Sequence, residues 1–84
     1  MVLDLVKFIV SQFAENAEEA EYKVNETDSA VEIDVYLSPE DMGKVIGKQG
    51  KIAKAMRTLV RAASAKESKK YTVEIKEKGE AQAE

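Results

Sequence analysis

The chain has 84 residues, of which 44% are hydrophobic and 35% are charged, so it can form one domain with a small core. It has no Cys and no His, which excludes disulfides, thiol nucleophiles, thiolate metal sites and imidazole acid–base chemistry. No apolar run approaches the roughly 20 residues of a membrane span, and the N-terminus does not resemble a signal peptide. We therefore expect a cytoplasmic protein.

Charge is distributed unevenly along the chain, although the net charge is only −3. Residues 1–43 carry 2 basic and 11 acidic side chains, whereas residues 44–70 carry 9 basic and 1 acidic. Residues 71–84 carry 2 basic and 4 acidic side chains. A basic block in an acidic protein can form a local positive patch, and an anionic ligand responds to that patch more than to the net charge.

The first half of the chain predicts one helix followed by two strands. Apolar side chains recur at helical spacing between Val2 and about Ala20, which indicates an amphipathic helix. Strands are then expected at residues 22–24 and 31–37, because apolar and polar side chains alternate there. The side chains expected in the core are Val2, Val6, Ile9, Val10, Phe13 and Ala17 of the helix and Val31, Ile33, Val35 and Leu37 of the longer strand.

Two features of this half have both a structural and a functional interpretation. Phe8 projects away from the apolar stripe, so it is either a single exposed apolar residue or a contact with a partner. Glu32 and Asp34 lie on the acidic face of the longer strand, where we expect them in solvent rather than on a metal ion. No His and no third ligand lies nearby in the sequence to complete a metal site.

The segment Ser38-Pro39-Glu40-Asp41 is typical of the start of a helix. Ser38 can cap this helix, and Asp41 stands three residues later, where it can reach back as in a capping box. The helix is expected to end at Gly47. Its inward side chains are expected to be Met42, Val45 and Ile46.

A second helix is expected to begin after Gly50 and to run to about Ala65. Successive positions lie about 100° apart around a helix axis, which separates an apolar stripe from a basic stripe beside it. The apolar stripe is Ile52, Met56, Leu59, Val60 and Ala63, and the basic stripe is Lys54, Arg57 and Arg61. A third strand is expected at residues 71–76, followed by a flexible polar tail at residues 78–84. The expected order is helix, strand, strand, helix, helix, strand.

The turn between the last two helices carries the most specific signal. In Gly47-Lys48-Gln49-Gly50, the two glycines permit backbone angles closed to other residues and leave no Cβ in the way of a ligand. The next helix begins directly afterwards, so free N–H groups and the positive end of its dipole face the turn. Lys48 and Lys51 add mobile positive charge. This arrangement suits a phosphate backbone that passes close by, although a tight helix–helix connection would also need glycine.

The segment Val45-Ile46-Gly47-Lys48-Gln49-Gly50-Lys51, with the helix behind it, resembles the KH family of single-stranded RNA-binding domains. The G-x-x-G loop of that family clamps about four nucleotides of backbone. The resemblance runs from about residue 2 to residue 77 and is strongest to small bacterial proteins with a single KH domain. It implies an α+β, type II KH-like fold over residues 1–77, with a three-stranded sheet packed against helices. Ala53 departs from many KH domains, which have a large aliphatic residue there.

The resemblance also implies a groove between two walls. One wall would be the two central helices with their loop, and the other the third strand with the turn between the first two strands. The residues implied to bind RNA or to surround it with positive charge are Gly47, Lys48, Gln49, Gly50, Lys51, Ile46, Lys44, Lys54 and Arg57. Val45 and Ile52 lie near the groove and can equally belong to the core. Because Tyr71 is the only aromatic residue near the groove, weak binding with low base preference is expected.

Beyond RNA binding, the resemblance implies a role as an RNA chaperone or post-transcriptional regulator, with links to cell shape and cell wall biogenesis. It also implies pairing as a homodimer or with a larger KH-containing protein of the Jag/KhpB type. The run Ala62-Ala63-Ser64-Ala65 could give such a partner a close approach, or it could simply favour the helix and tight packing. A second copy would raise the affinity of a weak module through avidity.

Three alternatives to RNA binding have weaker support in the sequence. A protein-interaction subunit that does not hold RNA is the main alternative, but intact Gly47 and Gly50 with non-acidic residues between them favour RNA. An enzyme is not expected, because the loop lacks the Gly-Lys-Ser/Thr ending of a P-loop and no catalytic side-chain set is present. No cofactor or metal is expected. A helix-turn-helix for duplex DNA also joins two helices by a short turn, but the three strands and the double glycine favour a KH domain.

Overall fold

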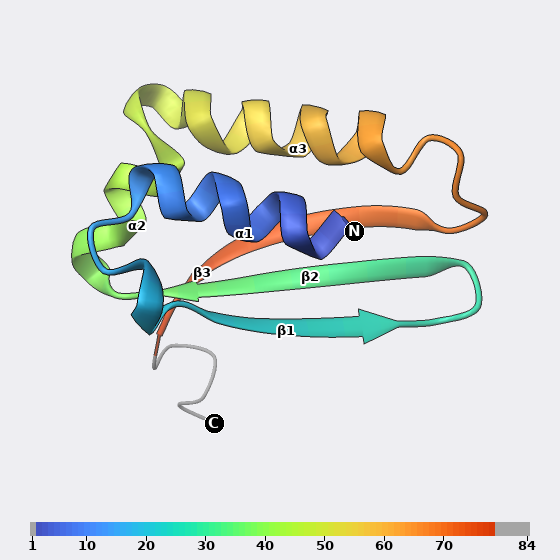
Figure 1. The fold of residues 1–84 in the computed structure, drawn as a ribbon, viewed down its shortest axis with the longest axis horizontal. Coiled ribbons are helices and arrows are strands. Elements are labelled where there is room, and N and C mark those ends of the chain that lie inside the picture. Colours follow the sequence, from blue (N-terminus) through green and yellow to red (C-terminus); the bar gives the residue numbers. More distant parts are fainter. Residues whose placement is uncertain (1, 79–84) are drawn as a thin grey trace.

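In residues 2–78, which this computed structural model describes, three α-helices lie over one face of a three-stranded sheet (Figure 1). The order of the elements is the order that the sequence predicted. The elements are α1 (Val2–Phe13), the short turn η1 (Ala17–Glu19), β1 (Glu21–Glu26), β2 (Ala30–Leu37), α2 (Pro39–Ile46), the turn η2 (Lys48–Gly50), α3 (Lys51–Ala63) and β3 (Lys70–Glu77).

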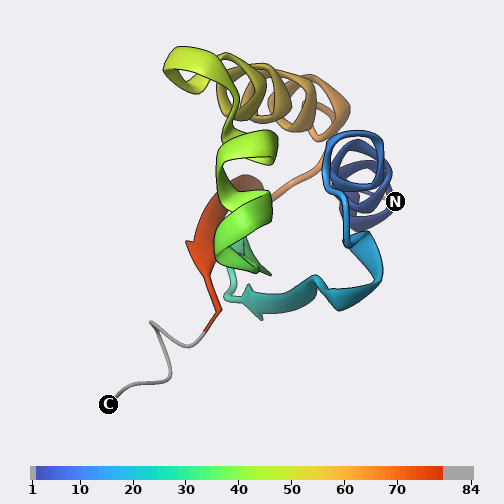
Figure 2. The same cartoon turned by 90° about the vertical axis from the view of Figure 1, so that its left-hand side faces the viewer.

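β2 is the central strand of the sheet. β1 pairs with it in antiparallel and β3 in parallel orientation, and Val24, Ile33 and Val73 are in register. A parallel pair cannot be joined by a tight turn, so α2 and α3 form the crossover between β2 and β3. Figure 2 shows the result from one end: α1 and α3 lie next to each other above the strands, and α2 stands at the near end of the molecule.

Apolar side chains from all three helices meet those of the sheet in one core. Burial of an aliphatic side chain contributes about 1.5–3 kcal/mol, so packing rather than helix propensity stabilises helices as short as these. The central members of the core are Val6 and Val10 of α1, Ile33 and Val35 of β2, Val45 of α2, Met56 and Val60 of α3, and Val73 of β3.

α1 ends at Phe13, although its periodicity predicted a helix that continues to about Ala20. The backbone N–H groups of Glu15 and Asn16 donate to the side chain of Asp41 rather than to carbonyls of the preceding turn. This contact with another helix draws the chain out of the helical path. Phe13, which was expected in the core, is 45% exposed.

The outer face of β2 is not the exposed acidic surface that the sequence predicted. Asp34 is 4% exposed and Tyr36 is also buried, because β2 is central and side chains of both neighbouring strands flank it. Lys76 of β3 lies over both residues: its Nζ is 3.6 Å from Oδ2 of Asp34 and 5.9 Å from the centre of the Tyr36 ring. The charge of Asp34 raises the pKa of Lys76. Glu32 is half-buried.

α3 is rotated about its axis relative to the orientation that its apolar pattern predicted. Its buried residues are Ala53, Met56 and Val60, and Ser64 is buried directly after it. The small side chain of Ala53 lets the helix approach the core along this line, and the hydroxyl of Ser64 is satisfied by donating to the Val60 carbonyl at 2.8 Å. Of the residues expected to face inward, Ile52 is half-buried, whereas Leu59 and Ala63 are exposed.

α2 begins after Ser38 as predicted, but its capping contacts differ from the prediction. The Ser38 side chain makes no capping hydrogen bond, and its Oγ is buried with no hydrogen-bond partner among the described residues. Asp41 does not reach back to the start of its own helix. Its two carboxylate oxygens accept backbone N–H groups that follow α1, so the capping-box prediction is wrong.

The C-terminal end of the described range is hydrogen-bonded to the fold. Lys78, predicted to begin the flexible tail, donates its backbone N–H to the Leu37 carbonyl at 2.8 Å and its Nζ to the Glu19 carbonyl at 3.0 Å. The remaining residues of the predicted tail, 79–84, lie outside the described residues.

Candidate nucleic-acid interface

The turn between α2 and α3 has an unusual backbone. Gly47 has φ 82° and ψ 170°, Gln49 has φ 58° and ψ 24°, and Gly50 has φ 74° and ψ 16°. The conformation of Gly47 belongs to a region that essentially only glycine adopts. The Gly50 N–H donates to the Gly47 carbonyl at 3.0 Å and closes the turn.

The two glycines are required for different reasons. A Cβ added at Gly47 would lie 2.7 Å from Cγ1 of Ile52, so the first glycine makes room for the start of α3. A Cβ added at Gly50 would meet no atom within 4 Å. The second glycine therefore faces open space, where a ligand can approach the backbone closely.

α3 starts at Lys51, directly after this turn. No side chain caps its first turn, so the N–H groups at its N-terminus and the positive end of its dipole face the same space as Gly50. Lys48 and Gln49 are exposed at the tip of the turn. The turn therefore presents backbone donors and a mobile cation together.

The predicted cationic residues do not all lie in the same environment. Lys51, Lys54 and Arg57 are exposed on α3 at spacings of three residues, and Arg61 follows four residues after Arg57. Lys44 on α2 instead pairs with Glu15, with 2.6 Å between Nζ and Oε1, and this hydrogen bond raises the pKa of Lys44. Its charge is thus partly balanced within the protein. The apolar candidates near the turn also differ, because Val45 is fully buried in the core whereas Ile46 and Ile52 are half-buried.

A groove of about 490 Å³ lies between α3 and β3, further along α3 than the glycine turn. The residues that line it are Arg57, Val60 and Arg61 of α3, Ser64, Ala65 and Glu67 to Lys69 of the loop, and Lys70 to Glu74 of β3. Tyr71 is the aromatic residue in this lining, as the sequence predicted. The turn between β1 and β2 does not line the groove, although the resemblance implied that it would.

The β1–β2 hairpin instead contacts the loop that precedes β3. Lys69 forms an ion pair with Glu26, and the Lys70 N–H donates to the Ser29 carbonyl at 3.0 Å. The loop that lines the groove between α3 and β3 is thereby held against the β1–β2 hairpin.

Arg57 bridges the two walls of the groove. Its Nε donates to the Val73 carbonyl at 3.3 Å. β3 is an edge strand, and in a parallel pair alternate residues direct both backbone groups away from the partner strand. The edge that faces α3 therefore offers backbone donors and acceptors within reach of a bound ligand. The predicted site residues did not include Arg61 or the edge of β3. The sequence placed Arg61 only in the basic stripe of the helix.

The site thus combines an open glycine turn, a helix N-terminus, a row of cations and a groove with a polar edge. Comparison with known proteins identifies the family of this chain. The family model described as "KhpA/KhpB, KH domain" matches residues 3–75. The chain belongs to the KhpA/KhpB family of KH domains.

Several relatives of this KH domain carry the name RNA-binding protein KhpA. The protein from Clostridium perfringens is 49% identical over 74 residues, which cover 86% of this chain and 96% of the relative. The protein from Caldanaerobacter subterraneus is 47% identical over 72 residues, with 86% and 96% covered. The protein from Aquifex aeolicus is 35% identical over 74 residues, with 88% and 94% covered.

The family match agrees with the α+β fold and the three-stranded mixed sheet described above. Across residues 2–78, none of the helices combines the length and the apolar character needed to cross a bilayer.

Proposed function

We propose that this KH domain binds single-stranded RNA and holds the sugar–phosphate backbone at the turn from Gly47 to Gly50. The observation that carries the proposal is the open space over Gly50 at the uncapped start of α3. Phosphate oxygens can approach backbone N–H groups there with no Cβ between them. The relatives named as RNA-binding proteins support the same ligand class.

From this turn, the strand would follow α3 toward the groove between α3 and β3. Lys51, Lys54 and Arg57 lie along that path, and α3 with its 13 residues is about 20 Å long. That length suits the roughly four nucleotides that a KH loop and groove hold. The edge of β3 and the guanidinium of Arg57 would then meet the bases.

Base preference is expected to be low. Stacking on an aromatic side chain contributes about 1–3 kcal/mol per base, and the groove lining offers Tyr71 alone for this. A module that holds mainly the backbone suits many RNA sequences. We therefore propose a role as an RNA chaperone or post-transcriptional regulator in the cytoplasm, rather than recognition of one defined sequence.

A titration of labelled single-stranded RNA at several salt concentrations tests the proposal. Each phosphate neutralised on a single strand lowers the logarithm of the binding constant by about 0.7 per tenfold rise in salt. With about four phosphates held, we expect a slope near −3. The same oligonucleotide annealed to its complement is the control and should bind more weakly. Binding that is independent of salt, or equal for the duplex, would contradict the proposal.

A second function, docking to another KH-containing protein, is favoured by one observation. Phe8 of α1 is 61% exposed and Leu59 of α3 is 48% exposed, and α1 and α3 are neighbouring helices in the outer layer (Figure 2). Leu59 and Arg57 lie about 200° apart around the axis of α3, so a partner on Leu59 leaves the groove open. The partner would be a second copy or a larger KH-containing protein of the Jag/KhpB type.

Replacing Leu59 by Asp tests self-association. The parent protein should show a mass that rises with concentration in light scattering, and Leu59→Asp should remain a monomer because a charge cannot be buried in an apolar contact. The neighbouring exposed residue Thr58 gives the matched control, since Thr58→Asp adds the same charge outside the apolar surface. A parent that is monomeric at all concentrations contradicts self-association.

A further inference from the structure

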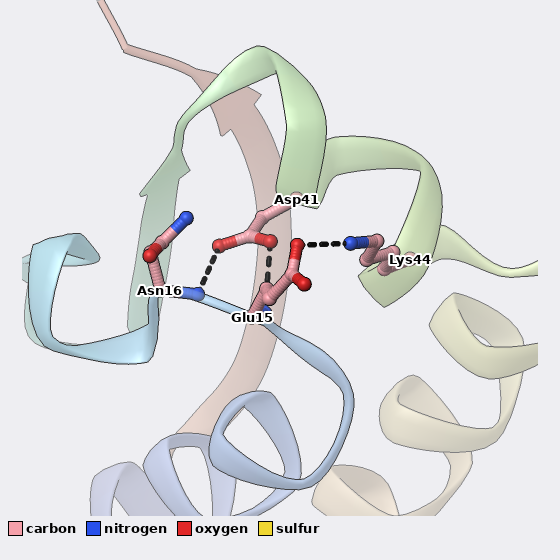
Figure 3. A network of polar contacts seen from close by, with 4 residues as sticks. All are labelled: Glu15, Asn16, Asp41 and Lys44. Carbon is pink, nitrogen blue, oxygen red and sulfur yellow. Dashed lines mark hydrogen bonds and ion pairs between the residues drawn. The ribbon is translucent and has the colours of Figure 1, made fainter.

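A buried carboxylate joins α1 to the helix that leads into the glycine turn. Asp41 of α2 is 1% exposed. Its Oδ1 accepts the N–H of Glu15 and its Oδ2 accepts the N–H of Asn16, each at 2.9 Å (Figure 3). Both oxygens of one side chain thus hold backbone that lies 25 and 26 residues earlier in the sequence.

A second contact ties the same two segments together. Lys44, three residues after Asp41 on α2, pairs with the side chain of Glu15 (Figure 3). The segment that follows α1 is therefore held at its backbone by Asp41 and at a side chain by Lys44. The Lys44–Glu15 pair is exposed to solvent, which weakens an ion pair, whereas Asp41 is buried, so the Asp41 contacts are expected to dominate.

α2 is anchored by few buried side chains, because besides Asp41 only Val45 lies in the core and Met42 packs partly buried against it. It has only eight residues, and its buried residues are Asp41 and Val45. Its last residue precedes Gly47, so Asp41 lies about 9 Å from the glycine turn along the helix axis. A shift of α2 against α1 would move the turn relative to the start of α3, where the backbone donors and Lys51 lie.

We infer that Asp41 is a positioning residue for RNA binding: it fixes α2 against the end of α1 and thereby places the turn from Gly47 to Gly50 where RNA is held. The inference rests on the proposed function. Asp41 itself touches no RNA, since its carboxylate is buried and both of its oxygens are engaged by backbone N–H groups.

Asp41→Asn is the direct test, because the amide has the same shape but only one oxygen to accept a hydrogen bond. RNA affinity is measured by titration under conditions where denaturation shows the variant to be folded. Hydrogen exchange is followed at the Gly47 and Gly50 amides, which donate to the Gly43 and Gly47 carbonyls. We expect RNA binding at least about fivefold weaker and faster exchange at both amides.

Val6→Ala is the matched control, because Val6 is a fully buried core residue of α1 and its loss destabilises the fold without touching the Asp41 contacts. We expect its RNA affinity to stay within about twofold of the parent. If Asp41→Asn and Val6→Ala have the same affinity and the same exchange at the turn, Asp41 is merely structural and the inference is wrong.

Three further outcomes are informative. If Asp41→Asn does not fold, Asp41→Glu is tested instead. Its added methylene lengthens the arm, so α2 must shift against the end of α1 for both contacts to be kept, and weaker RNA binding is expected; unchanged RNA affinity overturns the inference. If the parent protein binds no single-stranded RNA, the proposed function fails and the inference fails with it. A parent that binds while Asp41→Asn binds equally well overturns the inference alone.

Discussion

Replacing Lys48 and Gln49 by Asp will remove RNA binding while the protein remains folded. Both residues are exposed at the tip of the turn, where the proposal places the phosphate backbone. The double substitution removes a cation and adds two anions there, and like charges brought together cost several kcal/mol. We expect affinity at least about a hundredfold lower than that of the parent. Position 49 has φ 58°, which Asp adopts more readily than Gln does, so folding should be preserved.

The control for this experiment carries the same change of charge on another surface. Lys7→Asp with Gln12→Asp alters two exposed residues of α1 and also lowers the net charge by three. Its cost in stability should be small, on the order of the 0.5–1 kcal/mol of the contact between Lys7 and the Tyr22 ring. RNA titration compares the affinities of the two variants, and circular dichroism verifies that both are folded. A folded Lys48→Asp, Gln49→Asp variant that binds no worse than the control would show that the turn does not hold RNA.

Gly47→Ala should mainly lower the stability of the fold, whereas Gly50→Ala should mainly weaken RNA binding. At Gly47, the backbone angles exclude an L side chain and the new Cβ would overlap Ile52, so we expect a loss of about 3 kcal/mol or more of folding free energy. At Gly50, the angles are left-handed helical and the space is open, so the loss should be about 1–2 kcal/mol. The methyl group at Gly50 would instead obstruct RNA, and affinity should fall although most molecules are folded.

Urea denaturation of the two variants measures the difference, and Gly43→Ala provides the reference. Gly43 lies within α2 with nothing near its position for a Cβ to meet, so alanine there should stabilise the protein by about 0.5–1 kcal/mol. Equal stability of Gly47→Ala and Gly50→Ala would contradict the separate roles assigned to the two glycines. Unchanged RNA affinity in Gly50→Ala would place the RNA backbone elsewhere.

Local patterns were sufficient for the order of elements and for the turn. The period of apolar residues indicates whether a segment is a helix or a strand, because the direction of each side chain depends only on the local geometry of the helical turn or the strand pleat. The paired glycines at 47 and 50 indicate a backbone that other residues cannot adopt, and both have positive φ in the structure. The candidate site at the turn follows from the same local reasoning, and its role in RNA binding stays a prediction.

Contacts between segments far apart in the chain account for the differences between the predictions from the sequence and the structure. Asp41 was predicted to serve its own helix, yet it holds backbone that follows α1. Asp34 was predicted in solvent, yet the neighbouring strands bury it because β2 is central. The orientation of α3 could not be predicted because Ile52, Met56 and Leu59 are all apolar, and their pattern does not tell which side meets the sheet.

The sequence by itself therefore determined the type and order of the elements, the place of the glycine turn and the row of cations after it. The tertiary structure alone decided which partner each buried carboxylate takes, which side of α3 enters the core, and how Arg57 meets the edge of β3. The physical reason is the range over which the interactions act along the chain. Backbone angles and periodicity depend on residues within a turn, whereas burial and hydrogen-bond partners depend on which element packs alongside, and that element is often encoded far away in the chain.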